Sequence, residues 1–148
     1  MSASPVIQGS CHCGAIRYDF HPSVPVADLP VRACGCSFCS RHGARYTADS
    51  GGRLVVTITA PGRLNRYRFG TETAEFLVCA ACGVVPVVLG EIDGTTYAGI
   101  NVNTAVDADF SAHPVRTMDY GGEAMEQRRA RRKKSWIADV TVVNGPWS

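Results

Sequence analysis

The chain has 148 residues, 45% of them hydrophobic, and a formal net charge of +2 at pH 7. This length and apolar content predict one globular domain over residues 1–148 and exclude a chain that is disordered throughout. The small net charge by itself indicates no particular class of partner.

The sequence contains no apolar run near the roughly 20 residues that cross a membrane. Its N-terminus, MSASPVIQGS, lacks the basic start and apolar stretch of a secretory signal. We therefore expect a cytoplasmic protein without a membrane partner. In that compartment disulfides are rare, so clustered cysteines indicate metal binding or reactivity.

Short stretches of β-branched, aromatic and alternating residues are separated by glycine and proline turns along most of the chain. We expect strands at residues 15–20, 31–33, 54–59, 64–69, 76–78, 84–89 and 95–102. One helical turn or more is expected in residues 103–110, and residues 122–136 are the one long stretch compatible with a helix. The pattern predicts a mainly β fold, a sandwich or folded sheet, with little helix.

The segment at about residues 122–136 is strongly basic. It contains Arg128, Arg129, Arg131, Arg132, Lys133 and Lys134 within seven positions. One interpretation is the solvated face of a short helix, and the other is contact with an anionic partner. No aromatic residues interleave the charges, so a nucleic-acid partner is the less favoured interpretation. Trp136, Ile137 and residues 140–143 are expected to return the tail to the body.

Seven cysteines fall into three groups along the chain. Zinc binds thiolates tetrahedrally, and structural sites are usually filled by four protein ligands. The Cys-x-Cys and Cys-x-x-Cys pairs can together form such a site, from Cys11, Cys13, Cys79 and Cys82. A closed site of this kind contributes on the order of 10 kcal/mol to folding.

The middle group, Cys34, Cys36 and Cys39, has only three cysteines. Three thiolates on one zinc leave the fourth position open to water or to an incoming thiol, as in catalytic zinc sites. The sequence is also compatible with a different pairing of the cysteine groups, with cysteines that are buried apolar residues, or with His12 or His42 completing a second structural site.

Three motifs together resemble the glutathione-dependent formaldehyde-activating (GFA) family, whose domain is shared with centromere protein V. They are GSCHCGAIR at residues 9–17, CGCSFCSRHGA at residues 34–44 and CAACG at residues 79–83. The resemblance covers residues 7 to 110. It implies a fold of complex, folded β-sheets that carry zinc knuckles.

The resemblance also implies two zinc ions for this chain. A structural zinc would be held by Cys11, Cys13, Cys79 and Cys82, and a catalytic, labile zinc by Cys34, Cys36 and Cys39. The activity implied is that of a carbon–sulfur lyase, which condenses glutathione with formaldehyde to S-(hydroxymethyl)glutathione. The implied partners are a small thiol and a small aldehyde.

Residues next to the middle group are candidates for substrate contacts. Arg41 can bind a substrate carboxylate, His42 can give a proton to the developing alkoxide, and Tyr46 can line a pocket. The sequence thus predicts a zinc-dependent carbon–sulfur lyase or synthase. The rival hypothesis is a non-catalytic, zinc-stabilised binding module whose basic tail engages a protein or nucleic acid.

Overall fold

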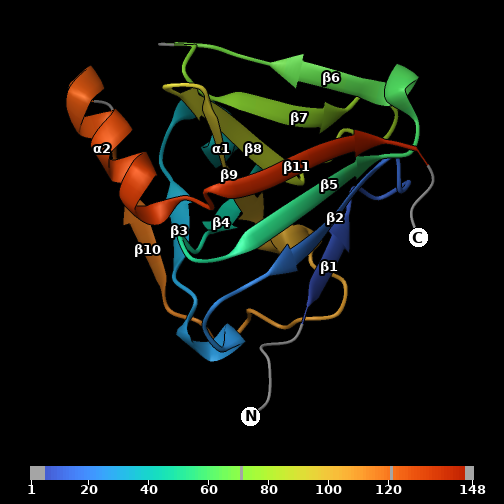
Figure 1. Cartoon of the computed structure of the whole chain (residues 1–148), viewed down its shortest axis with the longest axis horizontal. Helices are drawn as coiled ribbons and strands as arrows, with labels where there is room; N and C mark the ends of the chain where they lie inside the picture. Colours follow the sequence, from blue (N-terminus) through green and yellow to red (C-terminus); the bar gives the residue numbers. More distant parts are fainter. Residues whose placement is uncertain (1–5, 71, 121, 146–148) are drawn as a thin grey trace.

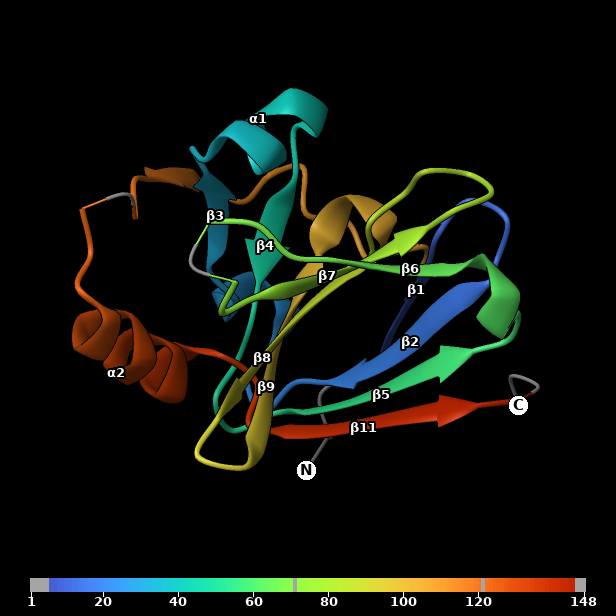
Figure 2. The ribbon, with the colours of Figure 1, turned by 90° about the horizontal axis from the view of Figure 1, so that it is seen from above.

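The computed structural model describes residues 6–70, 72–120 and 122–145. Within these residues the chain forms two sheets, which Figures 1 and 2 show from two directions. The four-stranded sheet contains, in spatial order, β1 (Ile7–Ser10), β2 (Ile16–His21), β5 (Arg53–Ile58) and β11 (Asp139–Asn144). The seven-stranded sheet contains, again in spatial order, β10 (Val115–Met118), β3 (Val31–Cys34), β4 (Arg45–Thr47), β9 (Thr95–Asn101), β8 (Val87–Ile92), β7 (Glu75–Cys79) and β6 (Leu64–Tyr67).

The alternation of residues in β2 and β5 shows how the smaller sheet buries one face. Ile16, Tyr18 and Phe20 are fully buried, while the residues between them are partly exposed, because successive side chains of a strand point to opposite faces. The antiparallel register places Tyr18 beside the buried Val56 of β5. These side chains share one core cluster with apolar residues of β7, β8 and β9, so the main core lies between the two sheets.

Strand β11 ties the C-terminal part of the described chain to both sheets. It pairs in parallel with β5 and runs beside it in Figure 1. Just before it, Ile137 is fully buried and exchanges two backbone hydrogen bonds of 2.9 Å with Ala98 of β9. This is the return of the tail that Trp136, Ile137 and the following valines predict.

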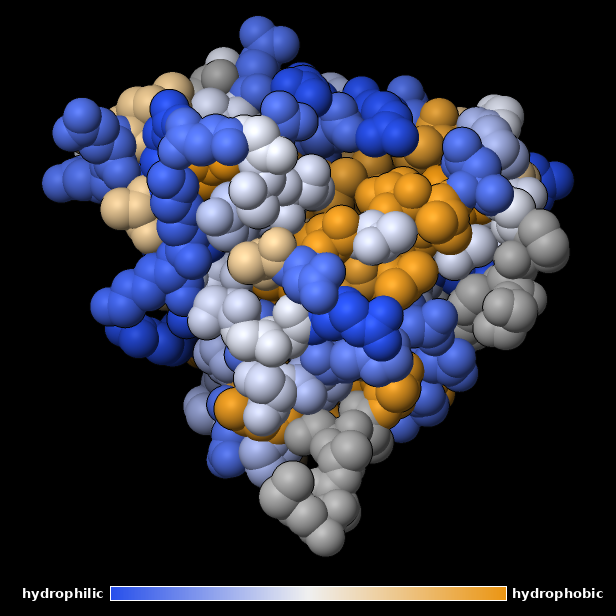
Figure 3. Space-filling view, in the orientation of Figure 1, coloured by the Kyte–Doolittle hydropathy of each residue, from blue (hydrophilic) through white to orange (hydrophobic). Residues whose placement is uncertain are grey.

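Helical structure is limited in the described residues. It consists of α1 (Ser37–His42), α2 (Met125–Ser135) and the 3₁₀ turns Val26–Asp28, Pro61–Arg63 and Val102–Thr104. None of these described helices has the length and apolar character that a membrane crossing requires. In the space-filling view, hydrophilic residues dominate over α2, whereas apolar residues reach the surface between β6 and β11 (Figure 3).

The prediction of a mainly β fold with little helix is confirmed. Four short strands were not predicted, namely β1, β4, β10 and β11. The first three have three or four residues each, too few to show a clear alternation. The expected turn or more of helix at residues 103–110 is wrong beyond Thr104, where the 3₁₀ turn ends.

The strand expected at residues 84–89 begins only at Val87. The residues before it serve the neighbouring turn instead of a ladder. The Val84 carbonyl accepts a hydrogen bond from the Cys79 amide, and the Val85 carbonyl accepts one from the Asn101 side chain. Pro86 has no N–H to donate to a strand partner.

Candidate functional site

The seven cysteine sulfurs form two separate clusters in the described structure. Within each cluster the sulfurs all lie within 4.8 Å of one another. The first cluster contains Cys11, Cys13, Cys79 and Cys82, and the second contains Cys34, Cys36 and Cys39. These are the same four-plus-three sets that the resemblance implies, and both are suited to hold a metal ion.

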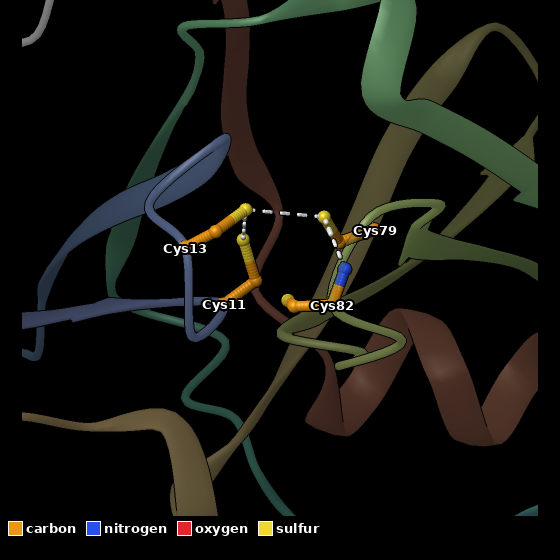
Figure 4. Close-up of side chains that lie close together, drawn as sticks. All are labelled: Cys11, Cys13, Cys79 and Cys82. Atoms are coloured by element: carbon orange, nitrogen blue, oxygen red, sulfur yellow. Dashed lines mark hydrogen bonds between the residues drawn. The ribbon is translucent and has the colours of Figure 1, made fainter.

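The four-cysteine cluster joins two turns that are far apart in sequence. Cys11 and Cys13 come from the β1–β2 connection, and Cys79 and Cys82 come from the end of β7, with their sulfurs turned toward one another (Figure 4). The Cys13 sulfur lies 3.9 Å from that of Cys11 and 3.4 Å from that of Cys79. Tetrahedral zinc with Zn–S bonds of about 2.3 Å places sulfurs about 3.8 Å apart, so the donor set fits this metal.

Backbone hydrogen bonds hold both turns in the shape of a metal-binding knuckle. The amide of Ile16 donates to the Cys11 sulfur at 3.3 Å, and the amide of Cys82 donates to the Cys79 sulfur at 3.4 Å. Gly83 ends the second turn with a φ of 79°, a left-handed conformation that favours glycine. Such bonds to ligand atoms orient them toward a metal.

The cysteines of this cluster differ in the pKa of their thiols. Burial raises the pKa of the Cys11 thiol to about 12. Burial also acts to raise that of Cys82, but hydrogen bonds from the backbone of Val84 and Cys13 outweigh it and hold the pKa at about 6. The pKa of Cys13 is lowered as well, first by a hydrogen bond from the backbone of Ala15. In this cluster the pKa of one thiol is therefore raised and the pKa of two is lowered.

The three-cysteine cluster is built around the start of α1. Cys34 ends β3, Cys36 is the N-cap residue of α1, and Cys39 lies buried in its first turn. The Cys36 sulfur accepts a hydrogen bond from the Cys39 amide at 3.3 Å. Gly43 then ends the helix with a φ of 66°, so the whole knuckle is closed by local structure.

No histidine, aspartate, glutamate or further cysteine of the described residues places a ligand atom within this second cluster. The hypothesis that His12 or His42 completes a structural site therefore finds no support in the geometry. A metal held by these three sulfurs would keep a position for an outside ligand, which is the arrangement of catalytic zinc.

The pKa values of Cys34 and Cys39 in the second cluster are shifted in opposite directions. The pKa of the Cys34 thiol falls to about 5, first because the Cys39 thiol donates a hydrogen bond to it. A hydrogen bond from the Cys36 backbone and the charge of Arg131 lower it further, whereas burial acts in the opposite direction. The pKa of Cys39 rises for the matching reason, with burial adding to the effect. Burial, together with the nearby thiols, raises the pKa of Tyr46, so its phenol is protonated at neutral pH.

Two hollows that share six lining residues open beside this cluster, and we call them the narrow and the wider part of one cavity. Its narrow part, about 100 Å³, is lined by Cys34 and Cys39, by Tyr46, and by Arg131 and Arg132 of α2. A wider part, about 320 Å³, shares several of these walls and adds Cys36 and Arg128. The three-cysteine cluster thus faces a hollow large enough for a small substrate.

The residues predicted to contact substrate are placed differently by the structure. Tyr46 lines the cavity, and its hydroxyl lies 3.6 Å from the Cys39 sulfur. Arg41 is exposed and donates to the Ser37 carbonyl of its own helix at 2.7 Å. His42 is exposed and packs edge-on against Phe38, with ring centroids 4.8 Å apart. Neither Arg41 nor His42 is among the cavity-lining residues of the described chain.

Sequence reasoning missed the wall contributed by α2. Arg128 and Arg132 are buried, at 9% and 8% exposure, and Arg131 is half-buried, so the basic run is not a single solvated face. A signal was present in the spacing, because positions 128, 131 and 132 share one face of a helix. No apolar pattern on that face showed that it points inward.

The model of one protein family, described as glutathione-dependent formaldehyde-activating enzyme, matches residues 6–118. The chain belongs to this family. A structurally similar protein is the subject of a crystal structure from Rhodobacter sphaeroides, with a TM-score of 0.56 and 29% sequence identity. The similarity covers 75% of this chain and 99% of the Rhodobacter sphaeroides chain.

The extent of the family match divides the site into two parts. All seven cysteines and Tyr46 lie within residues 6–118, whereas α2 and β11 lie beyond them. The cavity of this GFA protein therefore has one wall from the family domain and one wall from the segment that follows it.

Proposed function

We propose that the protein is a carbon–sulfur lyase of the GFA type, which adds a small thiol to a small aldehyde or runs the reverse reaction. Glutathione and formaldehyde are the substrates that the family description suggests. The observation that carries the proposal is the cluster of Cys34, Cys36 and Cys39, which faces a cavity and has no fourth ligand from the described residues.

The reaction balances without an oxidant or reductant. The thiol loses its proton, and the sulfur forms a bond to the carbonyl carbon. The π bond of the carbonyl breaks, and its electron pair moves to oxygen, which takes up a proton. No proton is gained or lost overall. In reverse, the carbon–sulfur bond breaks and the sulfur leaves as thiolate.

Zinc is the metal that the donor sets fit best, and we propose two ions per chain. At the three-cysteine site it would lower the pKa of a bound thiol and so supply thiolate at neutral pH. The four-cysteine site, which links β1–β2 to β7, would have a structural role.

The chain's own residues orient the substrate and exclude water. Phe76 and Val88 contribute apolar walls to the narrow part of the cavity, which strengthens electrostatic interactions inside it. Tyr46 holds a protonated hydroxyl in the same wall, so it can donate a hydrogen bond to the oxygen that becomes negative. Because His42 packs outside the cavity, we assign this donor to Tyr46, while the role predicted for His42 is open to a parallel test.

The rival hypothesis of a binding module has less support. Two of the six basic residues in the run, Arg128 and Arg132, are buried. Arg129 and Lys133 both form ion pairs with Asp93. Few free charges remain on α2 for a nucleic acid.

All seven cysteines are free thiols, which suits the cytoplasmic location and the single zinc-binding domain that we infer.

The decisive experiment is Cys36→Ser, assayed for thiol–aldehyde condensation with metal content measured on the same sample. We expect a folded protein with one zinc in place of two and with little activity. A folded variant with full activity would show that the three-cysteine site is not the catalytic centre.

A further inference from the structure

Helix α2 has two basic faces with different environments. Arg129 and Lys133 lie on the outer face and share the exposed carboxylate of Asp93. Arg128, Arg131 and Arg132 lie on the inner face and line the cavity beside the three-cysteine cluster. The inner face therefore brings three cations to the position where a substrate would bind.

The charges on the inner face are only partly compensated. Arg128 and Arg131 both form ion pairs with Glu123, at 3.4 and 2.8 Å. Asp119 also lines the wider part of the cavity, and Arg32 adds a further cation to the narrow part. Arg132 has no ion pair with a carboxylate of the described residues. The cavity therefore carries an excess of positive charge.

Arg132 is held in place by contacts that leave part of its guanidinium free. Its Nη1 donates to the carbonyl and hydroxyl oxygens of Thr73, at 3.1 and 3.0 Å. Its Cζ lies 4.7 Å from the ring centroid of Trp136. Its Nε is buried and has no hydrogen-bond partner within the described chain. Loss of water, followed by the charges of Arg131 and Arg128, lowers the pKa of Arg132 to about 10.

A second buried polar atom without a partner within the described residues lines the same cavity, on the wall that comes from the family domain. Thr47 is 1% exposed, and its hydroxyl oxygen has no hydrogen-bond partner within the described residues. Buried polar groups in proteins are nearly always paired, and an exception calls for a missing partner. A buried guanidinium and a buried hydroxyl on one small cavity fit an anionic ligand with oxygen atoms.

We propose that Arg132, together with Arg131, binds a carboxylate of the substrate thiol, so that this protein is specific for anionic thiols. The planar fork of arginine matches a carboxylate with two parallel hydrogen bonds. That the bound anion is the substrate rests on the lyase function proposed above. That the site binds an anion does not depend on that function. Both arginines lie beyond the family match at residues 6–118, so this specificity would belong to the segment that follows the match.

Binding can be measured apart from catalysis with an unreactive probe. The chain has two tryptophans, and replacing Trp147 with phenylalanine leaves Trp136, on the cavity wall, as the fluorescent reporter. The probes are 3-(methylthio)propionate and its neutral analogue 3-(methylthio)propanol. We expect the carboxylate to bind about tenfold more tightly, since a hydrogen bond to a charged group is worth about 1.5–3 kcal/mol.

Variants of α2 identify the residues responsible. Arg132→Gln and Arg131→Gln should each remove most of the preference for the carboxylate. The matched control is Arg129→Gln, which removes the same charge from the outer face and should leave the preference intact. If Arg132→Gln fails to fold, Arg131→Gln and Arg132→Lys still test the proposal, because lysine keeps the charge but loses the fork.

Several outcomes would overturn the proposal. They are equal affinity for the two probes, equal effects of Arg129→Gln and Arg131→Gln, or inorganic phosphate binding more tightly than the carboxylate. In turnover assays with formaldehyde, 3-mercaptopropionate should exceed 2-mercaptoethanol in kcat/KM. If the protein accelerates the reaction of 2-mercaptoethanol with glyoxylate, relative to the uncatalysed rate, more than the reaction with acetaldehyde, the carboxylate belongs to the aldehyde and the proposal is wrong. Anion binding without any turnover would contradict the lyase function alone.

Discussion

The hydroxyl of Tyr46 lies 3.6 Å from the sulfur of Cys39, and both groups face the cavity beside α2. Strand β4 and helix α1 hold these two residues, so the contact joins the seven-stranded sheet to the cysteine knuckle. Because the phenol stays protonated at neutral pH, it can donate its single proton either to the sulfur or to a ligand in the cavity.

Tyr46→Phe should therefore keep the fold and the metal content but lower kcat by about tenfold to a hundredfold, through loss of one donor. Steady-state kinetics and metal analysis measure both quantities. His42→Ala, assayed in parallel, tests the proton-transfer role predicted for the histidine. If kcat is unchanged in Tyr46→Phe and falls strongly in His42→Ala, the donor to the product oxygen is His42 and not Tyr46.

The two cysteine clusters should differ in their effect on stability. Cys82→Ser opens the four-cysteine site that joins distant strands, so we expect loss of cooperative unfolding or a destabilisation of several kcal/mol out of about 10. Cys36→Ser affects a knuckle closed by α1 and should change stability far less. Thermal unfolding with metal analysis distinguishes them, and a Cys82→Ser protein as stable as wild type would contradict the structural role.

Glu123 should make stability depend on pH. Its pKa is lowered from 4.5, first by hydrogen bonds from Arg131 and then by nearby arginine charges, against the effect of burial. The unfolded chain therefore takes up this proton at a higher pH than the folded chain does. The contribution is complete above pH 4.5 and is lost as the pH falls through the lowered folded value.

Urea unfolding of wild type and Glu123→Gln should accordingly show a difference of about 1 kcal/mol at neutral pH that shrinks near pH 4. Glu126→Gln is the matched control, because Glu126 is exposed on the first turn of the same helix. A difference that grows as the pH falls would have the wrong sign and would rule out this account of α2 docking.

Ile137 should be a major source of stability for the C-terminal segment. Its side chain is fully buried where the chain leaves α2 and bridges to β9. Ile137→Ala should cost about 3 kcal/mol in the free energy of unfolding. Val143→Ala, on the exposed part of β11 at 40% exposure, should cost less than about 1 kcal/mol. Equal costs would show that the tail is not packed as described.

The sequence allowed the cysteine groups to be predicted better than the walls of the cavity beside them. Spacing identified the three cysteine groups, because a knuckle is a local structure in which residues two or three positions apart turn to one point. Which groups share a site was left open by spacing and was implied by the family resemblance. Tyr46 was found by its closeness to the motif. Arg41 and His42 were equally close, yet the helical turn of α1 directs them away from the cavity.

The contribution of α2 could not be predicted in the same way. Arg131 and Arg132 reach the cavity because β10 pairs with β3, next to Cys34, and β11 pairs with β5. Both pairings are parallel and join segments more than 80 positions apart, so no local pattern reveals them. The inner face of α2 is also basic where an apolar stripe usually marks burial.

The position of α2 between β10 and β11 has a consequence for how the selectivity of this protein can be changed. All cysteines of the two candidate metal sites lie within the family match at residues 6–118, while the opposite wall of the cavity comes from the later part of the chain. Substitutions in that later part can change which molecules enter without touching a metal ligand. Under the functions proposed above, the residues for the chemistry and those for the choice of substrate would lie in successive stretches of one chain.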